Sequence, residues 1–292
     1  MEPSKHSPAK QFTLVTKSYL PDLARCELLV ESAQRCSPGL KHHLIIDHRD
    51  IPHFRHLADR ATIITSEDLL PWWVKQVPGR RSVWLSLRSR PTRGWIMQQV
   101  LKIAAASQIG ADVSVFCDSD VAFIRPFSTS QIIAGESVAL LDVEFVNEEV
   151  QRWTTVAAAL LGLDAATLPM RGHVGNLICW RQENVAAMIS RIETVSGVDW
   201  RVALMRQPTF SEYILYGVHT RAVLGYDSSG QHPSAAPLVK VSWGVDMHDE
   251  TAFDEFFTSF EPATVAVMVH SKDGIDPARY RRRLEGIWAT GS

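Results

Sequence analysis

Several features that mark specialised classes of protein are scarce or absent in this chain of 292 residues. It has four cysteines with no CxxC pair, and no aliphatic run approaches the ~18 residues of a membrane span. The formal net charge is −2, with 21% charged and 46% apolar residues. These values exclude a disordered or disulfide-dependent chain and weigh against a nucleic-acid partner.

The cysteines lie in segments that predict helix or strand interiors, so they are expected to be buried, reduced thiols. They are Cys26, Cys36, Cys117 and Cys179. The first eleven residues are polar, and Thr13, Thr16 and Lys17 interrupt the apolar stretch that follows, which predicts no secretory signal. We therefore expect a cytoplasmic protein.

Acidic residues are missing from Leu69 to Ala111, although the segment carries seven positive charges and four of the nine tryptophans. One interpretation is a long surface loop whose aromatic side chains pack on the core. The other is a flap that binds an acceptor, with tryptophan faces for sugar or lipid and arginines for phosphate. The charged residues are Lys75, Arg80, Arg81, Arg88, Arg90, Arg93 and Lys102.

Short β-branched runs alternate with helical patterns in the first part of the chain. Strands are predicted over 12–16, 43–47, 61–65 and 113–117, and a helix over 23–33. Because these strands are apolar on both faces, they predict a largely parallel central sheet that is covered by helices.

The pattern changes to α+β after the fourth strand. Further strands are predicted over 138–143, 177–180 and 264–269, and helices over 147–162, 183–195 and from about 276. No repeat, low-complexity segment or linker interrupts the chain, so we expect a single domain over 1–292. A two-lobed body divided near Asp120 is the alternative.

Two carboxylates follow the fourth strand in the stretch Phe116-Cys117-Asp118-Ser119-Asp120. Strand ends are where ligands bind in α/β sheets. Side chains two residues apart on an extended chain point the same way, so Asp118 and Asp120 can converge on one hard divalent cation. The alternative is a pair of turn carboxylates that cap the following segment.

Two other segments lie in a suggestive context. The helical run 94–104 leads directly into this strand, and Lys102 is its only charge. The late apolar strand ends in His270, Ser271 and Lys272, which supply a neutral imidazole and a phosphate partner. A satisfied surface histidine is the plainer interpretation of His270.

Taken together, these residues resemble the GT-A class of nucleotide-sugar glycosyltransferases, and the stretch DSDVAFIRPF after a QQxLK helix is similar to an uncharacterised bacterial branch. The resemblance runs from Phe12 to about Gly274. It implies an α/β, Rossmann-type sandwich with a mostly parallel central sheet flanked by helices. It also implies a nucleotide-binding half over about 11–126, an acceptor-side half over about 127–292, and transfer of a sugar from a nucleoside-diphosphate sugar to a hydroxyl acceptor.

The resemblance assigns roles to individual residues. Asp118, Asp120 and His270 would bind Mn²⁺ or Mg²⁺, with Asp118 also facing the ribose and Asp120 part of the catalytic set. The donor would contact Thr16, Lys17, Asp47, Lys102, Asp118, Ser119, His173 and Lys272.

An inverting enzyme of this class also needs a carboxylate base. Ser211 predicts an N-cap that places Glu212 in the first turn of a helix, where a glutamate serves either as a base or as a partner of the helix dipole. On the acceptor side we expect Trp84, Arg88, Arg90, Asp142 and Glu144. Asp142 and Glu144 either read sugar hydroxyls or lie on the wet face of a strand.

Arg279 and 281–283 form a basic cluster on the last predicted helix. It is either a solvated face or a peripheral attachment to anionic lipid at the inner face of the membrane.

Two other function classes compete. An aspartate-nucleophile phosphatase also uses an apolar strand followed by DxD, with Asp118 as nucleophile and Asp246 and Asp249 approximating its second acidic motif. A nucleotide-sugar or carbohydrate-binding protein without activity is the third.

Overall fold

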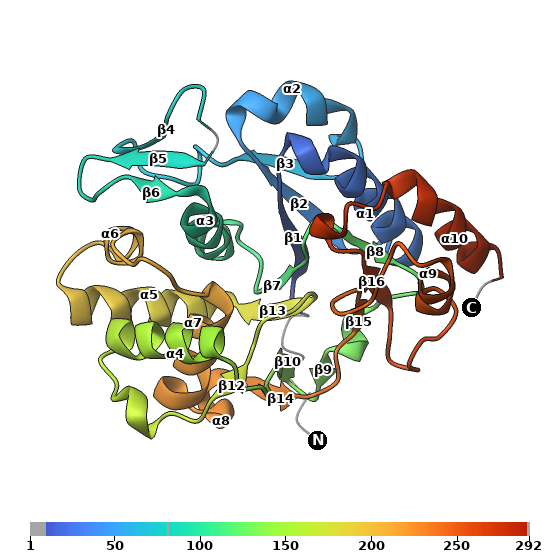
Figure 1. The fold of residues 1–292 in the computed structure, drawn as a ribbon. Helices are drawn as coiled ribbons and strands as arrows, with labels where there is room; N and C mark the ends of the chain where they lie inside the picture. Colours follow the sequence, from blue (N-terminus) through green and yellow to red (C-terminus); the bar gives the residue numbers. More distant parts are fainter. Residues whose placement is uncertain (1–9, 81, 291–292) are drawn as a thin grey trace, which may run out of the picture.

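The computed structural model describes residues 10–80 and 82–290, and its centre is a five-stranded sheet (Figure 1). The strand order is β13-β7-β1-β2-β3, and β1, β2, β3 and β7 are parallel whereas β13 is antiparallel to β7. The expected α/β fold with a mostly parallel sheet is confirmed. The strands are β1 (Phe12–Ser18), β2 (Lys41–Ile46), β3 (Thr62–Thr65), β7 (Val113–Phe116) and β13 (Ile178–Arg181).

Helices cover both faces of this sheet because neighbouring residues of each strand point to opposite sides. On β1, Val15 packs in the cluster that includes α3 to α7, whereas Leu14 packs in a cluster on the α1 side. The helices are α1 (Leu23–Cys36), α2 (Ile51–Phe54), α3 (Gly94–Gln108), α4 (Glu148–Leu161), α5 (Gln182–Ser196), α6 (Trp200–Met205), α7 (Glu212–Val218), α8 (Tyr226–Ser229), α9 (Glu250–Phe256) and α10 (Pro277–Thr290). The four cysteines are free and buried, as expected.

A second sheet brings the end of the chain to the residues that follow β7. It consists of β8 (Val121–Phe123), β16 (Ala266–Met268) and β15 (Val239–Val241), with β16 in the middle. The Val269 N–H donates to the Asp120 carbonyl at 3.2 Å. Residues some 150 positions apart therefore share one corner of the molecule.

The remaining strands form small sheets around this centre. The expected strand over 138–143 divides at Asp142 into β10 (Ser137–Leu141) and β11 (Val143–Glu144), because the two parts pair with different partners. The partners and the acid-free segment supply β9 (Ile133–Ala134), β14 (Gln231–Ser234), β12 (Arg171–Gly172), β4 (Val74–Gln76), β5 (Val83–Ser86) and β6 (Thr92–Arg93). The acid-free segment is thus a three-stranded sheet followed by α3 rather than a long loop.

The arginines of α10 face carboxylates on neighbouring helices. Arg279 pairs with Glu250 at 3.0 Å, Arg281 pairs with Glu31 at 2.6 Å, and Arg283 pairs with Asp254. These pairs neutralise most of the basic cluster, which favours the solvated face over attachment to anionic lipid. Within the described ranges, no helix is long and apolar enough to cross a bilayer.

Candidate active site

The candidate site lies where the strand order of the central sheet reverses. From β1 the chain proceeds to β2 and β3 on one side and returns to β7 on the other, and the region outside the carboxyl ends of strands at such a reversal is where α/β sheets bind ligands. Asp118 and Asp120 follow β7, and Asp22 follows β1. Three carboxylates therefore gather at the switch point.

Asp120 is buried and incompletely satisfied. Its Oδ2 accepts from the Ser271 N–H at 3.0 Å, whereas its Oδ1 has no hydrogen-bond partner among the described residues. Burial, followed by the charge of Asp118, raises the pKa of Asp120 to about 7. A buried carboxylate oxygen without a donor is costly, and a cation at this oxygen would remove the cost.

Asp118 is held by its backbone and remains half-exposed through its side chain. Its N–H donates to Asn176 Oδ1 at 2.7 Å, and its Oδ1 accepts from Lys102 Nζ at 3.2 Å. The turn before β13, which contains Asn176, therefore fixes the direction in which Asp118 points.

Asp22 and Arg25 also lie near Asp118, although no sequence pattern singled them out as site residues. Burial raises the pKa of Asp22, against the charge of Arg25 and a hydrogen bond from Ser119, and the charge of Asp118 raises it further. Arg25 lies 3.5 Å from Asp22 and also donates to the Ile275 carbonyl at 3.1 Å. The position of Asp22 after the first strand was a signal that could have identified it, since β1 and β7 are neighbours.

Lys102 forms the centre of a buried charge cluster. Its Nζ lies 3.2 Å from Asp118, 3.0 Å from Glu212 and 3.0 Å from the Tyr213 hydroxyl. Burial opposes the charge, but Asp118, Tyr213 and Glu212 outweigh it and raise the pKa of Lys102 well above its usual range. These contacts favour the charged form of Lys102, which ties α3, α7 and the end of β7 together.

Glu212 begins α7 as expected, because the Ser211 side chain accepts from the Ile214 N–H at 3.4 Å. However, Glu212 is only 4% exposed, and its N–H donates to Gln99 Oε1 at 3.0 Å. In this conformation its carboxylate faces Lys102 rather than an open acceptor site. The base role predicted from its helix-start position stays a prediction, and the contacts of Glu212 in this structure are those of a residue that positions Lys102.

His270 and Lys272 flank Ser271, whose N–H donates to Asp120. The His270 N–H donates to Ser242 Oγ at 3.0 Å, its half-buried ring lies 6.4 Å from that of Trp243, and Lys272 is exposed. In the part of the chain that the structure describes, no three His, Cys, Asp or Glu side chains are arranged to hold a metal ion. The expected set of Asp118, Asp120 and His270 is therefore not assembled as a three-residue ligand group.

The donor chemistry of the two carboxylates nevertheless fits a divalent cation. Asp118 presents an accessible carboxylate, and Asp120 presents an oxygen that has no hydrogen-bond partner in the described part of the chain. Mg²⁺ is usually held by one or two carboxylates together with substrate phosphates and water. Asp118 and Asp120 match this arrangement better than they match an all-protein site.

The residues expected to bind the nucleoside differ in their surroundings: Thr16 is buried, whereas Lys17 and Asp47 lie at the ends of strands. Thr16 is fully buried and its hydroxyl is hydrogen-bonded to His42 Nε2 at 3.0 Å, so its side chain does not face an open site, and its donor contact stays a prediction. Lys17 and Asp47 form an ion pair of 2.8 Å at the carboxyl ends of β1 and β2, with Ser66 donating to Asp47 at 2.7 Å. Burial raises the pKa of Asp47, but Lys17 and its hydrogen-bond partners outweigh burial and lower it.

Three other side chains that were expected to contact a ligand are buried and contact other parts of the protein. Trp84 is 2% exposed and packs in the core, so its ring is not available to an acceptor. His173 is buried, bonds through Nδ1 to the Leu141 carbonyl at 2.6 Å, and lines a separate cavity of about 330 Å³. Asp142 is buried between Arg171 and the Tyr226 hydroxyl, which occupy its oxygens.

The exposed members of the acceptor set remain at the surface. Glu144 is exposed and pairs with Arg171 at 3.1 Å. The Arg88 guanidinium stacks 4.9 Å from the Trp73 ring, and Arg90 is exposed. Arg81 lies outside the described residues.

Comparison with known proteins identifies the family. Residues 11–291 match a family of unknown function, DUF6492. The chain belongs to this family. No curated protein matches it.

Two solved structures illustrate the fold similarity. The galactosyltransferase LgtC, in complex with donor and acceptor sugar analogs, has a TM-score of 0.48 and 11% identity over 94% of this chain and 95% of its own. Mouse xyloside xylosyltransferase 1, in its apo form, has a TM-score of 0.46 and 9% identity over 91% of this chain and 100% of its own.

Proposed function

We propose that this protein is a divalent-metal-dependent glycosyltransferase of the GT-A type, which moves a sugar from a nucleoside-diphosphate sugar to a hydroxyl acceptor. The observation that carries the proposal is Asp120. Its buried Oδ1 has no hydrogen-bond partner among residues 10–80 and 82–290, and its carboxyl lies close enough to Asp118 at the switch point of the sheet for that charge to raise its pKa. Such a site offers oxygen ligands to a cation where nucleotides bind.

In this proposal Asp118 and Asp120 hold Mn²⁺ or Mg²⁺. The cation would neutralise negative charge that develops on the departing nucleoside diphosphate. Lys102 orients Asp118 and is itself held by Glu212. Lys272 is exposed beside His270 and provides a second positive charge for a phosphate. A cytoplasmic location stays a prediction from the sequence.

The phosphatase alternative is weakened by its second acidic motif. Asp249 caps α9 by accepting from the Ala252 N–H at 2.8 Å, and Asp246 accepts from the His248 N–H at 3.0 Å. Both carboxylates are thus engaged in local backbone hydrogen bonds. In a phosphatase of this class Asp120 would be the acid or base, and the second acidic motif would have to present its carboxylates beside Asp118.

Thermal unfolding with UDP, GDP, CDP and TDP, each with and without Mn²⁺, tests the proposal. A ligand at about 100 times its Kd should stabilise the fold by about 2.7 kcal/mol, and we expect this only with the metal. The nucleotide that binds then selects the nucleotide sugars for product analysis. Hydrolysis of p-nitrophenyl phosphate without nucleotide binding would favour the phosphatase, and nucleotide-sugar binding without hydrolysis or transfer would favour a binding protein.

A further inference from the structure

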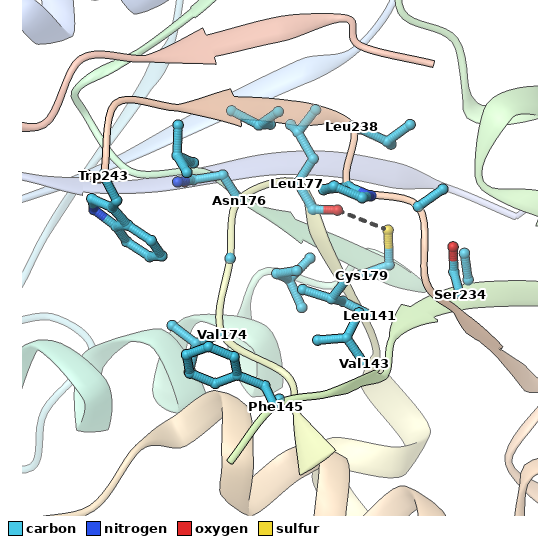
Figure 2. Close-up of a pocket in the computed structure, with 18 of the residues that line it drawn as sticks. Leu141, Val143, Phe145, Val174, Asn176, Leu177, Cys179, Ser234, Leu238 and Trp243 are labelled. Carbon is cyan, nitrogen blue, oxygen red and sulfur yellow. Dashed lines mark hydrogen bonds between the residues drawn. The ribbon is translucent and has the colours of Figure 1, made fainter. Parts of the chain in front are cut away.

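A large apolar cavity of about 920 Å³ lies beside the proposed catalytic site (Figure 2). Its walls come from β10, β11, the start of β13 and the segment that leads into β15. Aliphatic side chains dominate the lining. They include Leu141, Val143, Val174, Leu177, Leu238 and Val241.

The cavity shares residues with the candidate active site. Asn176 lines it and also accepts the hydrogen bond from the Asp118 N–H at 2.7 Å. Lys272 lines it from the 3-10 turn η7 (Ser271–Asp273). Trp243, whose ring lies 6.4 Å from that of His270, lines it from the loop after β15. The polar lining residues Asn176 and Lys272 therefore connect the cavity to the proposed reaction centre.

The backbone links the two sites through consecutive residues. Leu177 has a φ of 57°, which is uncommon for any residue with a side chain and rarer still for a branched apolar one. With this conformation Asn176 binds the backbone of Asp118 while Leu177 lines the cavity. A strained residue at such a junction points to a function for both sides of the turn.

Large apolar side chains also remain exposed around the cavity. Trp95 is 45% exposed, Phe145 is 52% exposed and Trp243 is 56% exposed, and all three line it. Partly exposed aromatic rings, two of them tryptophans with a polar N–H, beside an aliphatic interior suit a ligand with a polar head and an apolar chain.

We propose that this cavity binds the alkyl chain of an amphipathic acceptor and presents the acceptor's polar head, with its hydroxyl, at Asp118. The identity of the ligand as an acceptor rests on the proposed function, whereas binding of the chain rests on the cavity alone. A volume of about 920 Å³ is at the upper end of the range for small-molecule sites and exceeds the needs of a single sugar ring.

Calorimetric titration with hexyl and octyl glucoside, both below their critical micelle concentrations, tests the inference without donor or metal. Each added methylene that enters the cavity should lower the Kd roughly fourfold. Octyl glucoside should therefore bind on the order of tenfold more tightly than hexyl glucoside, and glucose should not bind measurably.

Substitutions that fill the cavity provide the structural control. Ala139 and Ala236 both line the cavity, whereas the neighbouring Ala235 is exposed and does not. We expect Ala139→Phe and Ala236→Phe to weaken octyl glucoside at least tenfold, and Ala235→Phe to leave the Kd unchanged. Ala236 is exposed, so Ala236→Phe remains informative if Ala139→Phe does not fold.

The outcomes separate this inference from the proposed function. Equal affinity for the hexyl and octyl compounds, or equal weakening by all three variants, would overturn the inference even if Mn²⁺-dependent nucleotide binding is found. Chain-length-dependent binding without any nucleotide binding would support the cavity and overturn the glycosyltransferase proposal.

Discussion

Asp120 combines a stability cost with the proposed metal function. Its pKa of about 7 in the folded protein lies above the ordinary value of 3.8, so its contribution to stability is fully present below about pH 4 and is lost as the pH rises through about 7. We expect the unfolding free energy of Asp120→Asn to be roughly 1–3 kcal/mol higher than that of the parent at about pH 8. We also expect it to lose Mn²⁺-dependent stabilisation by nucleoside diphosphates.

The matched control for this prediction is Asp246→Asn, which changes an exposed carboxylate with one backbone hydrogen bond. It should leave both properties unchanged. An unaltered Mn²⁺ response in Asp120→Asn would contradict the metal assignment.

Glu212 is the second residue whose buried contact, with Lys102, leads to a prediction. Replacing it with Gln leaves the buried Lys102 with Asp118 as its remaining charged partner, so we expect a loss of roughly 1–3 kcal/mol of unfolding free energy. Glu183→Gln is a suitable control because Glu183 also lies in the first turn of a helix, but its side chain is 64% exposed in its pair with Arg181. That control should change stability by less than about 1 kcal/mol.

Activity distinguishes the two roles of Glu212. If Glu212 only positions Lys102, Glu212→Gln should lose turnover together with unfolding free energy. If Glu212→Gln instead keeps parental stability and donor affinity while turnover falls by roughly 10² to 10⁴, Glu212 is the base after all.

Three arginines belong to the small sheet of β4, β5 and β6: Arg88 and Arg90 lie in the loop between β5 and β6, and Arg93 ends β6. Arg88, Arg90 and Arg93 are exposed. Arg93 lies two residues before Trp95, which lines the apolar cavity. Changing all three to Gln should raise the acceptor KM and reduce its salt dependence, because exposed phosphate contacts are screened by salt. Donor affinity should not change.

A control for this element comes from α10, where Arg281, Arg282 and Arg283 can be changed to Gln in the same way. Two of them pair with carboxylates and lie beside α1 and α9, away from β5 and β6 in Figure 1. Loss of nucleotide binding in the β5–β6 variant, with unchanged acceptor kinetics, would place this element on the donor side.

The molecule as a whole should be sensitive to acid because several histidines are buried in the neutral form. Burial lowers the pKa of His42 to about 3 and that of His219 to about 4, and it also lowers the pKa of His173. Because these pKa values lie below the unfolded value of about 6.5, the associated stability is present above pH 6.5 and is lost as the pH falls toward them.

Chemical unfolding between pH 7 and 4 measures this effect. We expect a loss on the order of 3 kcal/mol for His42 by about pH 4, and a shallower acid limb in His42→Gln. His53→Gln, at an exposed position, should retain the full slope. A parental slope in His42→Gln would show that this histidine is not buried in the neutral form.

The sequence by itself determined the βαβ opening, several later helices and strands, and the motif at the end of β7. Strand and helix periodicity are local properties, so the βαβ opening, α3 and the Ser211 cap could be predicted from neighbouring residues. The position of Asp118 and Asp120 after a buried parallel strand was equally local. A ligand site at the edge of the sheet followed from it.

Only the tertiary structure decided which side chains meet. Asp22 joins Asp118 because β1 and β7 are neighbours in the sheet, and Glu212 meets Lys102 because α7 packs against α3. Trp84 was expected to be an acceptor residue but is part of the core, and the apolar cavity is built from strands far apart in the chain. Contacts of this kind depend on strand order and packing between elements, and a one-dimensional pattern of residues does not contain either.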